Sequence, residues 1–136
     1  MSRMPEETLG RPLLEMVEPL AGFHDHRSFT LVGLDDDGTI SQLQATDRAD
    51  LSFLVVSPGL FFPDYAPFIG DAVRIALDIQ EPDELVLLLL VHPAATLADT
   101  TANLLAPVVV NARTGRAAQV VVGDWSLPLR APLAAA

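Results

Sequence analysis

The chain contains no cysteine and no lysine, and each absence removes a class of function. Without cysteine it can form no disulfide, no thiolate zinc site and no cysteine nucleophile. The 8 basic side chains are all arginines and face 18 acidic residues, which gives a formal net charge of −10. Phosphate backbones repel such a chain, so we expect no direct binding of nucleic acid. The acidic surface fits a basic protein partner, or it only keeps a hydrophobic chain in solution.

Long hydrophobic runs are missing as well. The longest, Leu85 to Val91, is far shorter than the roughly 20 residues that a membrane-spanning helix requires. The first residues lack the apolar core of a signal peptide, so we expect a cytoplasmic protein that does not enter a membrane. A length of 136 residues fits one domain. We expect that domain to be a monomer, with residues 1–12 and 127–136 loosely ordered.

The spacing of apolar residues predicts a mainly β fold. About seven short apolar segments alternate with turn residues, as in small barrels and sandwiches. The only expected helix is Ala72 to Leu77, with Asp71 as its N-cap. Together these features predict a small antiparallel β-barrel-like domain with one short helix. The expected strands are 13–20, 29–34, 40–45, 51–56, 85–91, 108–110 and 120–122.

The last two of these segments predict a β-hairpin. A three-residue loop from Arg113 to Gly115, with Gly115 at positive φ, places Val108, Val110 and Val120 on one face. The same register leaves Asn111 and Gln119 on the other face. Because polar and apolar side chains then separate, we prefer this register to a two-residue loop.

The segment before the hairpin contains Asn103, Leu104 and Pro107. Pro107 cannot donate a hydrogen bond to a sheet, so it is expected at a strand start or an edge. The amide of Asn103 can bond backbone groups that are left unpaired where the chain enters the strand. Recognition of a partner by Asn103 is the alternative.

Residues 61–68 form a proline-rich aromatic loop that holds four of the eight aromatic residues of the chain. Prolines stiffen the loop, which then either covers the core or presents a binding surface. We expect Phe62 and Tyr65 to differ, with one ring buried beneath the loop and the other facing a partner. Asp64 would add a charged contact at the rim.

Few residues could perform catalysis. His24 and His26 could share one side of a strand as metal ligands do, but the spacing places no third ligand, and a surface position is the preferred interpretation. The turn Asp35 to Gly38 lacks the downstream glutamate of a calcium loop. We therefore expect no metal, no cofactor and no enzymatic activity.

Several ordered motifs nevertheless resemble one family, the flagellar assembly factor FliW. The resemblance covers residues 15 to 133, and its most specific part is the Asn-Leu-x-Ala-Pro-x-x-x-Asn pattern from Asn103 to Asn111. The motifs that carry it are Gly22-Phe23, Phe29-Thr30-Leu31, Phe61-Phe62-Pro63-Asp64-Tyr65, Thr101 to Ala112 and Gln119 to Val122.

The resemblance implies a non-enzymatic cytoplasmic protein that binds flagellin. It also implies binding of the RNA-binding translational regulator CsrA, which relieves CsrA repression of flagellin translation by partner switching. The alternative is a small β-barrel that binds a ligand or stabilises a complex without regulating translation. The candidate partner-binding residues are Phe61, Phe62, Asp64, Tyr65, Asn103, Leu104, Pro107 and Asn111.

The sequence departs from the family pattern near its N-terminus. The usual Gly-Ile-Pro-Gly-Phe turn is Pro19 to Phe23 here, an Asp-Pro pair has become Arg48-Ala49, and the first strand is short. These departures put the shape of the first hairpin, and any contact that it makes, in doubt.

Overall fold

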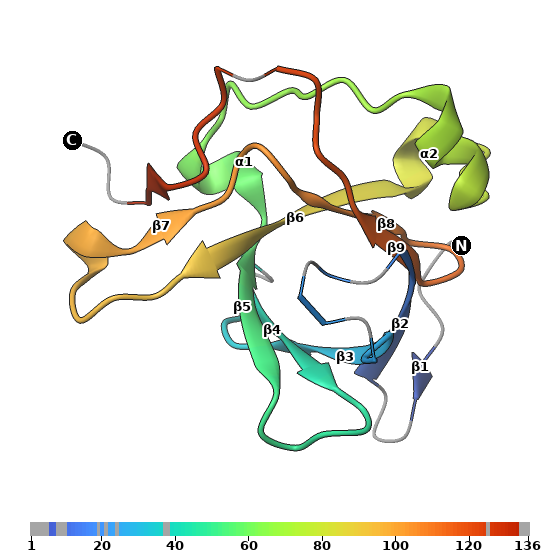
Figure 1. Ribbon diagram of the computed structural model, residues 1–136, viewed down its shortest axis with the longest axis horizontal. Coiled ribbons are helices and arrows are strands. Elements are labelled where there is room, and N and C mark those ends of the chain that lie inside the picture. Colours follow the sequence, from blue (N-terminus) through green and yellow to red (C-terminus); the bar gives the residue numbers. More distant parts are fainter. Residues whose placement is uncertain are drawn as a thin grey trace.

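The computed structural model describes residues 6–7, 11–18, 20, 22–23, 25–36, 39–124 and 126–133 (Figure 1). Three expected features include residues outside these ranges: the pair His24 and His26, the turn from Asp35 to Gly38, and the turn from Pro19 to Phe23. No helix in the described ranges is long and apolar enough to cross a membrane.

A closed barrel forms the body of the molecule, as the strand pattern predicted (Figure 1). Neighbouring strands run β2-β3-β4-β5-β6-β8-β9, and β9 returns to pair with β2. Every pair is antiparallel except β2 and β9, which are parallel, so the barrel is mixed rather than purely antiparallel. The barrel strands are β2 (Arg11–Glu18), β3 (Ser28–Gly33), β4 (Ile40–Ala45), β5 (Ser52–Val56), β6 (Leu85–His92), β8 (Val108–Asn111) and β9 (Arg116–Gln119).

Alternation of side chains made the middle strands predictable. Strand β4 has the expected bounds because Ser41, Leu43 and Ala45 point into the barrel while the residues between them face outward. The inner side chains of all strands form one core, with Phe29 and Leu14 fully buried at its centre. Strand β1 (Glu6–Glu7) pairs with β2 outside this ring.

The register of the β8–β9 hairpin differs from the predicted one by a residue. Val108 pairs with Gln119, and Val110 pairs with Ala117. Gly115 has the expected positive φ, 83°. The register prediction was wrong because both faces of β8 are buried, one in the barrel core and one under an outer layer. A strand that is apolar on both faces gives no alternation from which to read its register.

Strand β6 is the central strand that its continuous apolar run predicted. Its first half pairs with β8, its second half pairs with β5, and its last residues pair with β7 (Thr101–Ala102). The end of β6, the 3-10 turn η3 (Leu97–Asp99) and β7 form an arm that leaves the barrel (Figure 1). We call residues 91–102 the arm.

The C-terminal segment is not loosely held where the structure describes it. Strand β10 (Ala131–Pro132) pairs with β7, and Ala131 and Leu133 are buried. The peptide N–H of Leu104 donates to the Pro128 carbonyl at 3.0 Å. These residues complete an apolar cluster outside the barrel, which we call the arm cluster and which includes Val56, Leu89 and Val91. The apolar side chains of the tail bury themselves there, which explains the order.

Two short helices lie outside the barrel. Helix α1 (Pro58–Phe61) is a single turn at the start of the aromatic segment. Helix α2 (Asp71–Ala76) is the predicted one, but Gly70 is its N-cap and Asp71 lies in its first turn. There the carboxylate interacts favourably with the positive end of the helix dipole, but it does not accept a capping hydrogen bond. Helix α2 covers the outer face of β8 and β9, against which Leu77 is fully buried.

Candidate partner-binding site

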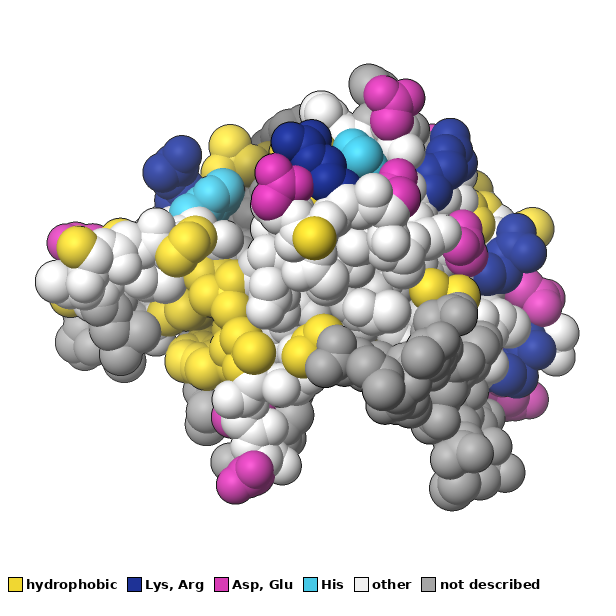
Figure 2. Space-filling model, turned by 90° about the horizontal axis from the view of Figure 1, so that it is seen from below, with side chains coloured by type: hydrophobic (Ala, Val, Ile, Leu, Met, Phe, Trp, Pro, Cys, Tyr) yellow, Lys and Arg dark blue, Asp and Glu magenta, His cyan; other side chains and the backbone are white. Residues whose placement is uncertain are grey.

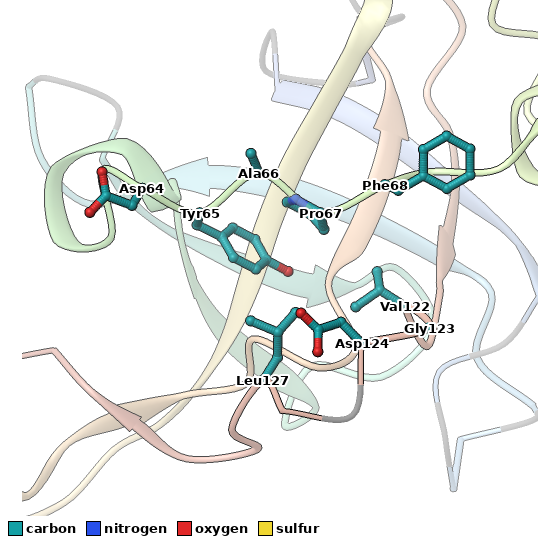
Figure 3. Close-up of a pocket in the computed structure, with 9 residues that line it drawn as sticks. All are labelled: Asp64, Tyr65, Ala66, Pro67, Phe68, Val122, Gly123, Asp124 and Leu127. Atoms are coloured by element: carbon teal, nitrogen blue, oxygen red, sulfur yellow. The ribbon is translucent and has the colours of Figure 1, made fainter.

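A groove of about 510 Å³ opens between the aromatic loop and the segment that follows β9 (Figure 3). We call it the loop groove; residues 64–68, 122–124 and Leu127 line it. In Figure 3 the ring of Tyr65 points from the loop toward Leu127 and Val122 on the opposite wall. A smaller pocket of about 320 Å³ shares Asp64, Tyr65 and Leu127 with the groove and extends to Phe62 and Leu104. Four of the predicted site residues therefore meet here: Phe62, Asp64, Tyr65 and Leu104.

Tyr65 fixes the loop to the chain beneath it. Its hydroxyl donates a hydrogen bond of 2.6 Å to the carbonyl oxygen of Leu104. Burial raises the pKa of Tyr65 to about 12, so the hydroxyl remains a donor at neutral pH. The rings of Phe61, Phe62 and Tyr65 are all partly buried against the arm cluster. Phe62 and Tyr65 thus share one environment and do not divide into one buried and one exposed ring.

The exposed ring of the loop is Phe68, which sequence reasoning placed in the loop but not in the site. Its side chain is 84% exposed, the largest exposure among the large hydrophobic residues of the described ranges. Pro67 precedes it, and the buried Ile69 follows it, so the backbone on both sides is held. An aromatic ring presented on a stiff backbone loses little entropy when a partner covers it.

Two carboxylates give the groove a negative rim. Asp64 is exposed at one end of the groove, and Asp124 stands beside Leu127 (Figure 3). Hydrogen bonds from the Ser126 hydroxyl and backbone N–H lower the pKa of Asp124. Asp124 is therefore charged at neutral pH. Apolar walls with acidic ends suit an amphipathic segment that carries positive charge.

Asn111, another predicted site residue, lies elsewhere and is 0% exposed. Its amide nitrogen donates to the carbonyl oxygens of Leu77 and Asp78 at 2.8 and 3.0 Å. Its amide oxygen accepts from the backbone N–H of Arg113 at 2.8 Å. One side chain thus ties the end of α2 to the turn of the hairpin. A residue with this burial and these partners stabilises the fold and has no surface to offer a partner.

The guanidinium of Arg113 completes the same connection. It donates to the Glu84 carboxylate at 2.9 Å and to the Asp78 carbonyl oxygen at 2.8 Å. Asp78 has φ of 57°, the left-handed position that ends a helix and that glycine usually occupies. Backbone N–H groups of Gln80 and Glu81 lower the pKa of Glu84, and Arg113 lowers it further. We call Asn111, Arg113, Glu84 and the end of α2 the hairpin lock.

Comparison with known proteins decides the family. The family model described as FliW protein matches residues 4–133.

The chain belongs to the FliW family.

Two relatives in this family carry the same name. The chain is 32% identical over 124 residues to the flagellar assembly factor FliW of Desulfitobacterium hafniense, covering 91% of this chain and 82% of that protein. It is also 32% identical over 114 residues to the protein of the same name from Bacillus subtilis, covering 84% and 80%. The FliW family consists of non-enzymatic assembly factors.

A solved structure shows the same fold. A crystal structure of the flagellar assembly factor FliW superimposes with a TM-score of 0.85 at 22% identity, covering 100% of this chain and 97% of that one. The parallel closure between β2 and β9 therefore lies within a fold already seen in a protein of that name.

The remaining residues of the FliW-like signature are structural in this chain. The amide oxygen of Asn103 accepts from the backbone N–H groups of Leu105 and Ala106, both at 3.0 Å, which confirms the interpretation that it bonds unpaired backbone groups. Pro107 is buried, and its carbonyl oxygen accepts from Val120. Within the same signature, the carbonyl oxygens of Leu104 and Leu105 accept from Tyr65 and Val122, two residues that line the loop groove.

The contacts of His26 are compatible with a surface histidine. Its Nδ1 lies 3.1 Å from the Asp47 carboxylate, and no group of three potential metal ligands occurs within the described ranges. One carboxylate oxygen of Asp35 accepts hydrogen bonds from the backbone N–H groups of Thr39 and Ile40, as is usual for an aspartate in a turn.

Proposed function

We propose that this FliW-family protein is a cytoplasmic flagellar assembly factor that binds flagellin in its loop groove. We further propose that it binds CsrA through its acidic surface and so relieves CsrA repression of flagellin translation. Free flagellin would take the protein away from CsrA, and export of flagellin would release it again. Family membership and the shared name of these two relatives support the assembly role. The two partners, flagellin and CsrA, and the cytoplasmic location are what the family resemblance implies.

The observation that most supports this flagellin site is the combination of an open groove with an exposed aromatic ring. An assembly factor that holds a subunit before polymerisation needs an apolar surface for an amphipathic segment. The loop groove offers apolar walls at Val122 and Leu127, and Phe68 lies exposed at its edge. Because the surrounding backbone is already ordered, binding costs little entropy there.

The acidic surface supports the second partner. A net charge of −10 attracts a protein that carries the basic surface needed for RNA binding. Binding of this kind also keeps RNA away, since the acidic surface repels phosphate. No chemistry takes place in this account, and the function consists of exchange between two partners.

The test replaces Phe68 with alanine and uses Ile75→Ala as the matched control. Both side chains are highly exposed, at 84% and 78%, but Ile75 lies on α2 and does not line the groove. We expect Phe68→Ala to weaken binding of purified flagellin by about tenfold, a loss typical of an aromatic anchor. The melting temperature should be unchanged in both variants, and Ile75→Ala should bind like the parent.

Two results would count against the proposal. Equal binding by Phe68→Ala and the parent would place the flagellin site elsewhere on the surface. A parent protein that retains no flagellin in a pull-down would favour the alternative, a small barrel that stabilises another complex.

A further inference from the structure

A second apolar surface lies outside the loop groove, where the arm meets the barrel wall. The outward-facing row of β3, β4 and β5 is polar at one end, with Gln42 and Gln44. At the other end it is apolar. There Ile40 pairs with Val56, and Leu54 and Phe61 pack beside them against the arm cluster. Figure 2 shows hydrophobic side chains gathered between the arm, at the left, and the barrel.

The apolar row extends to Leu34, whose side chain is exposed to solvent. The backbone N–H of Leu34 donates to the Ile40 carbonyl oxygen at 2.9 Å, which places the two residues side by side on neighbouring strands. The Leu34 side chain is 52% exposed, while Ile40 and Leu54 are only partly buried. We call Leu34, Ile40, Leu54 and Phe61 the arm corner. An apolar strip of this kind, rimmed by polar residues, marks an interaction site more often than a bare surface.

Acidic residues without ion pairs border the arm corner. Asp35 and Asp36 follow Leu34 directly, and both are exposed. Among the described residues, neither of the two forms an ion pair. Two arginines of the described ranges pair with acids elsewhere: Arg48 with Asp50, and Arg113 with Asp78 and Glu84.

We propose that the arm corner is the docking surface for the basic partner, separate from the loop groove that takes flagellin. The occupant is a protein surface in which apolar side chains are flanked by lysine or arginine. Its apolar residues cover Leu34, Ile40 and Leu54, and its cations meet Asp35 and Asp36. A second copy of this chain does not fit, because it would bring acids against acids. The inference rests on the proposed function, since it locates one of the two partners named there.

The experiment measures binding of purified CsrA and of purified flagellin to the parent and to two pairs of variants. Asp36→Arg is paired with Asp83→Arg, which changes the net charge equally but lies at the far end of β6, in η2 (Pro82–Glu84). Leu34→Ser is paired with Ile75→Ser, another exposed apolar residue that lies on α2. The control variants separate a local contact from a general change of charge or apolar surface.

Asp36→Arg and Leu34→Ser should each weaken CsrA binding by about tenfold, while both controls bind CsrA nearly as the parent does. Flagellin binding should stay at the parent level in all four variants. Equal losses in Asp36→Arg and Asp83→Arg, or parent-like CsrA binding by Leu34→Ser, would overturn the arm corner as the docking surface but leave the proposed function standing. A parent that binds no CsrA would overturn the CsrA part of the proposed function, and this inference with it.

Discussion

The hairpin lock and the loop groove use their polar groups in opposite ways. In the lock, Asn111, Arg113 and Glu84 bond one another or the end of α2. In the groove, Asp64 is exposed with its charge facing solvent, and Phe68 has its ring in water. Among the described residues, no buried side-chain nitrogen or oxygen lacks a partner. The polar groups of the lock are therefore bonded within the chain, whereas the charged and aromatic groups of the groove face solvent.

This separation explains why similar residues have different roles. Asn103 and Asn111 end the same sequence motif, yet Asn111 is 0% exposed and bonds residues more than 30 positions away. Asn103 bonds only the backbone two and three residues ahead of it. Loss of the first amide disconnects two elements, whereas loss of the second loosens one turn. Four substitutions test the comparison, from the largest expected effect to the smallest.

Asn111→Ala should lower the free energy of unfolding most. It leaves the Leu77 carbonyl without the Asn111 donor and the Arg113 N–H without its acceptor, whereas the Asp78 carbonyl keeps its bond from the Arg113 guanidinium. Unpaired buried groups of this kind cost about 3 kcal/mol together. Urea denaturation measures the loss, and flagellin affinity at a temperature where the variant is folded should match the parent. A stable variant that fails to bind flagellin would break the division between lock and groove.

Asn103→Ala should cost less, about 1 to 2 kcal/mol, because the N–H groups of Leu105 and Ala106 lose their acceptor in a partly exposed turn. Thermal melting checks the value. If the variant melts like the parent yet binds flagellin poorly, Asn103 contacts the partner and the structural interpretation is wrong.

Tyr65→Phe keeps the ring and removes the hydrogen bond to the Leu104 carbonyl oxygen. We expect a loss of about 1 kcal/mol, as for one neutral hydrogen bond, with a small change in flagellin affinity. Tyr65→Ala, which also removes the wall of the groove, should weaken binding in addition. Equal binding by the two variants would show that the ring itself does not contact flagellin.

Glu84→Gln should change the dependence of stability on pH. The pKa of Glu84 is lowered in the folded state, so its ionised form stabilises the fold above the unfolded pKa of about 4.3. That contribution disappears as the pH falls through the folded pKa. Melting temperatures should therefore show the parent above the variant at neutral pH, with the gap narrowing in acid. A gap that stays constant from about pH 7 to pH 3 would contradict the assignment.

Local patterns predicted most of the barrel strands, but the second hairpin strand lies at Arg116–Gln119 and not at 120–122, and long-range contacts arranged the candidate site. Strand β4 follows from the alternation of Ser41, Leu43 and Ala45, and β6 from its unbroken apolar run. The hairpin register could not follow, because α2 covers the second face of β8. The burial of Asn111 depends on carbonyls of Leu77 and Asp78, to which no local pattern points.

Long-range contacts also explain why the rings of the aromatic loop differ in exposure. Its density of rings predicted a binding surface or a cover; three of its rings cover the arm cluster, and one stays exposed. Phe61, Phe62 and Tyr65 pack on an arm cluster that is assembled from β5, β6, β7 and the C-terminal segment. Phe68 lies beyond the reach of that cluster and stays exposed. Which ring remains exposed is determined by the packing of these segments, which are distant in the sequence.

Backbone hydrogen exchange of the parent protein, with and without saturating flagellin, tests the central claim most directly. The account predicts slower exchange on binding in residues 64–68, 122–124 and 127, which line the loop groove, and no change in residues 111–116 of the hairpin lock. Protection in residues 111–116 with none in residues 64–68 would contradict it.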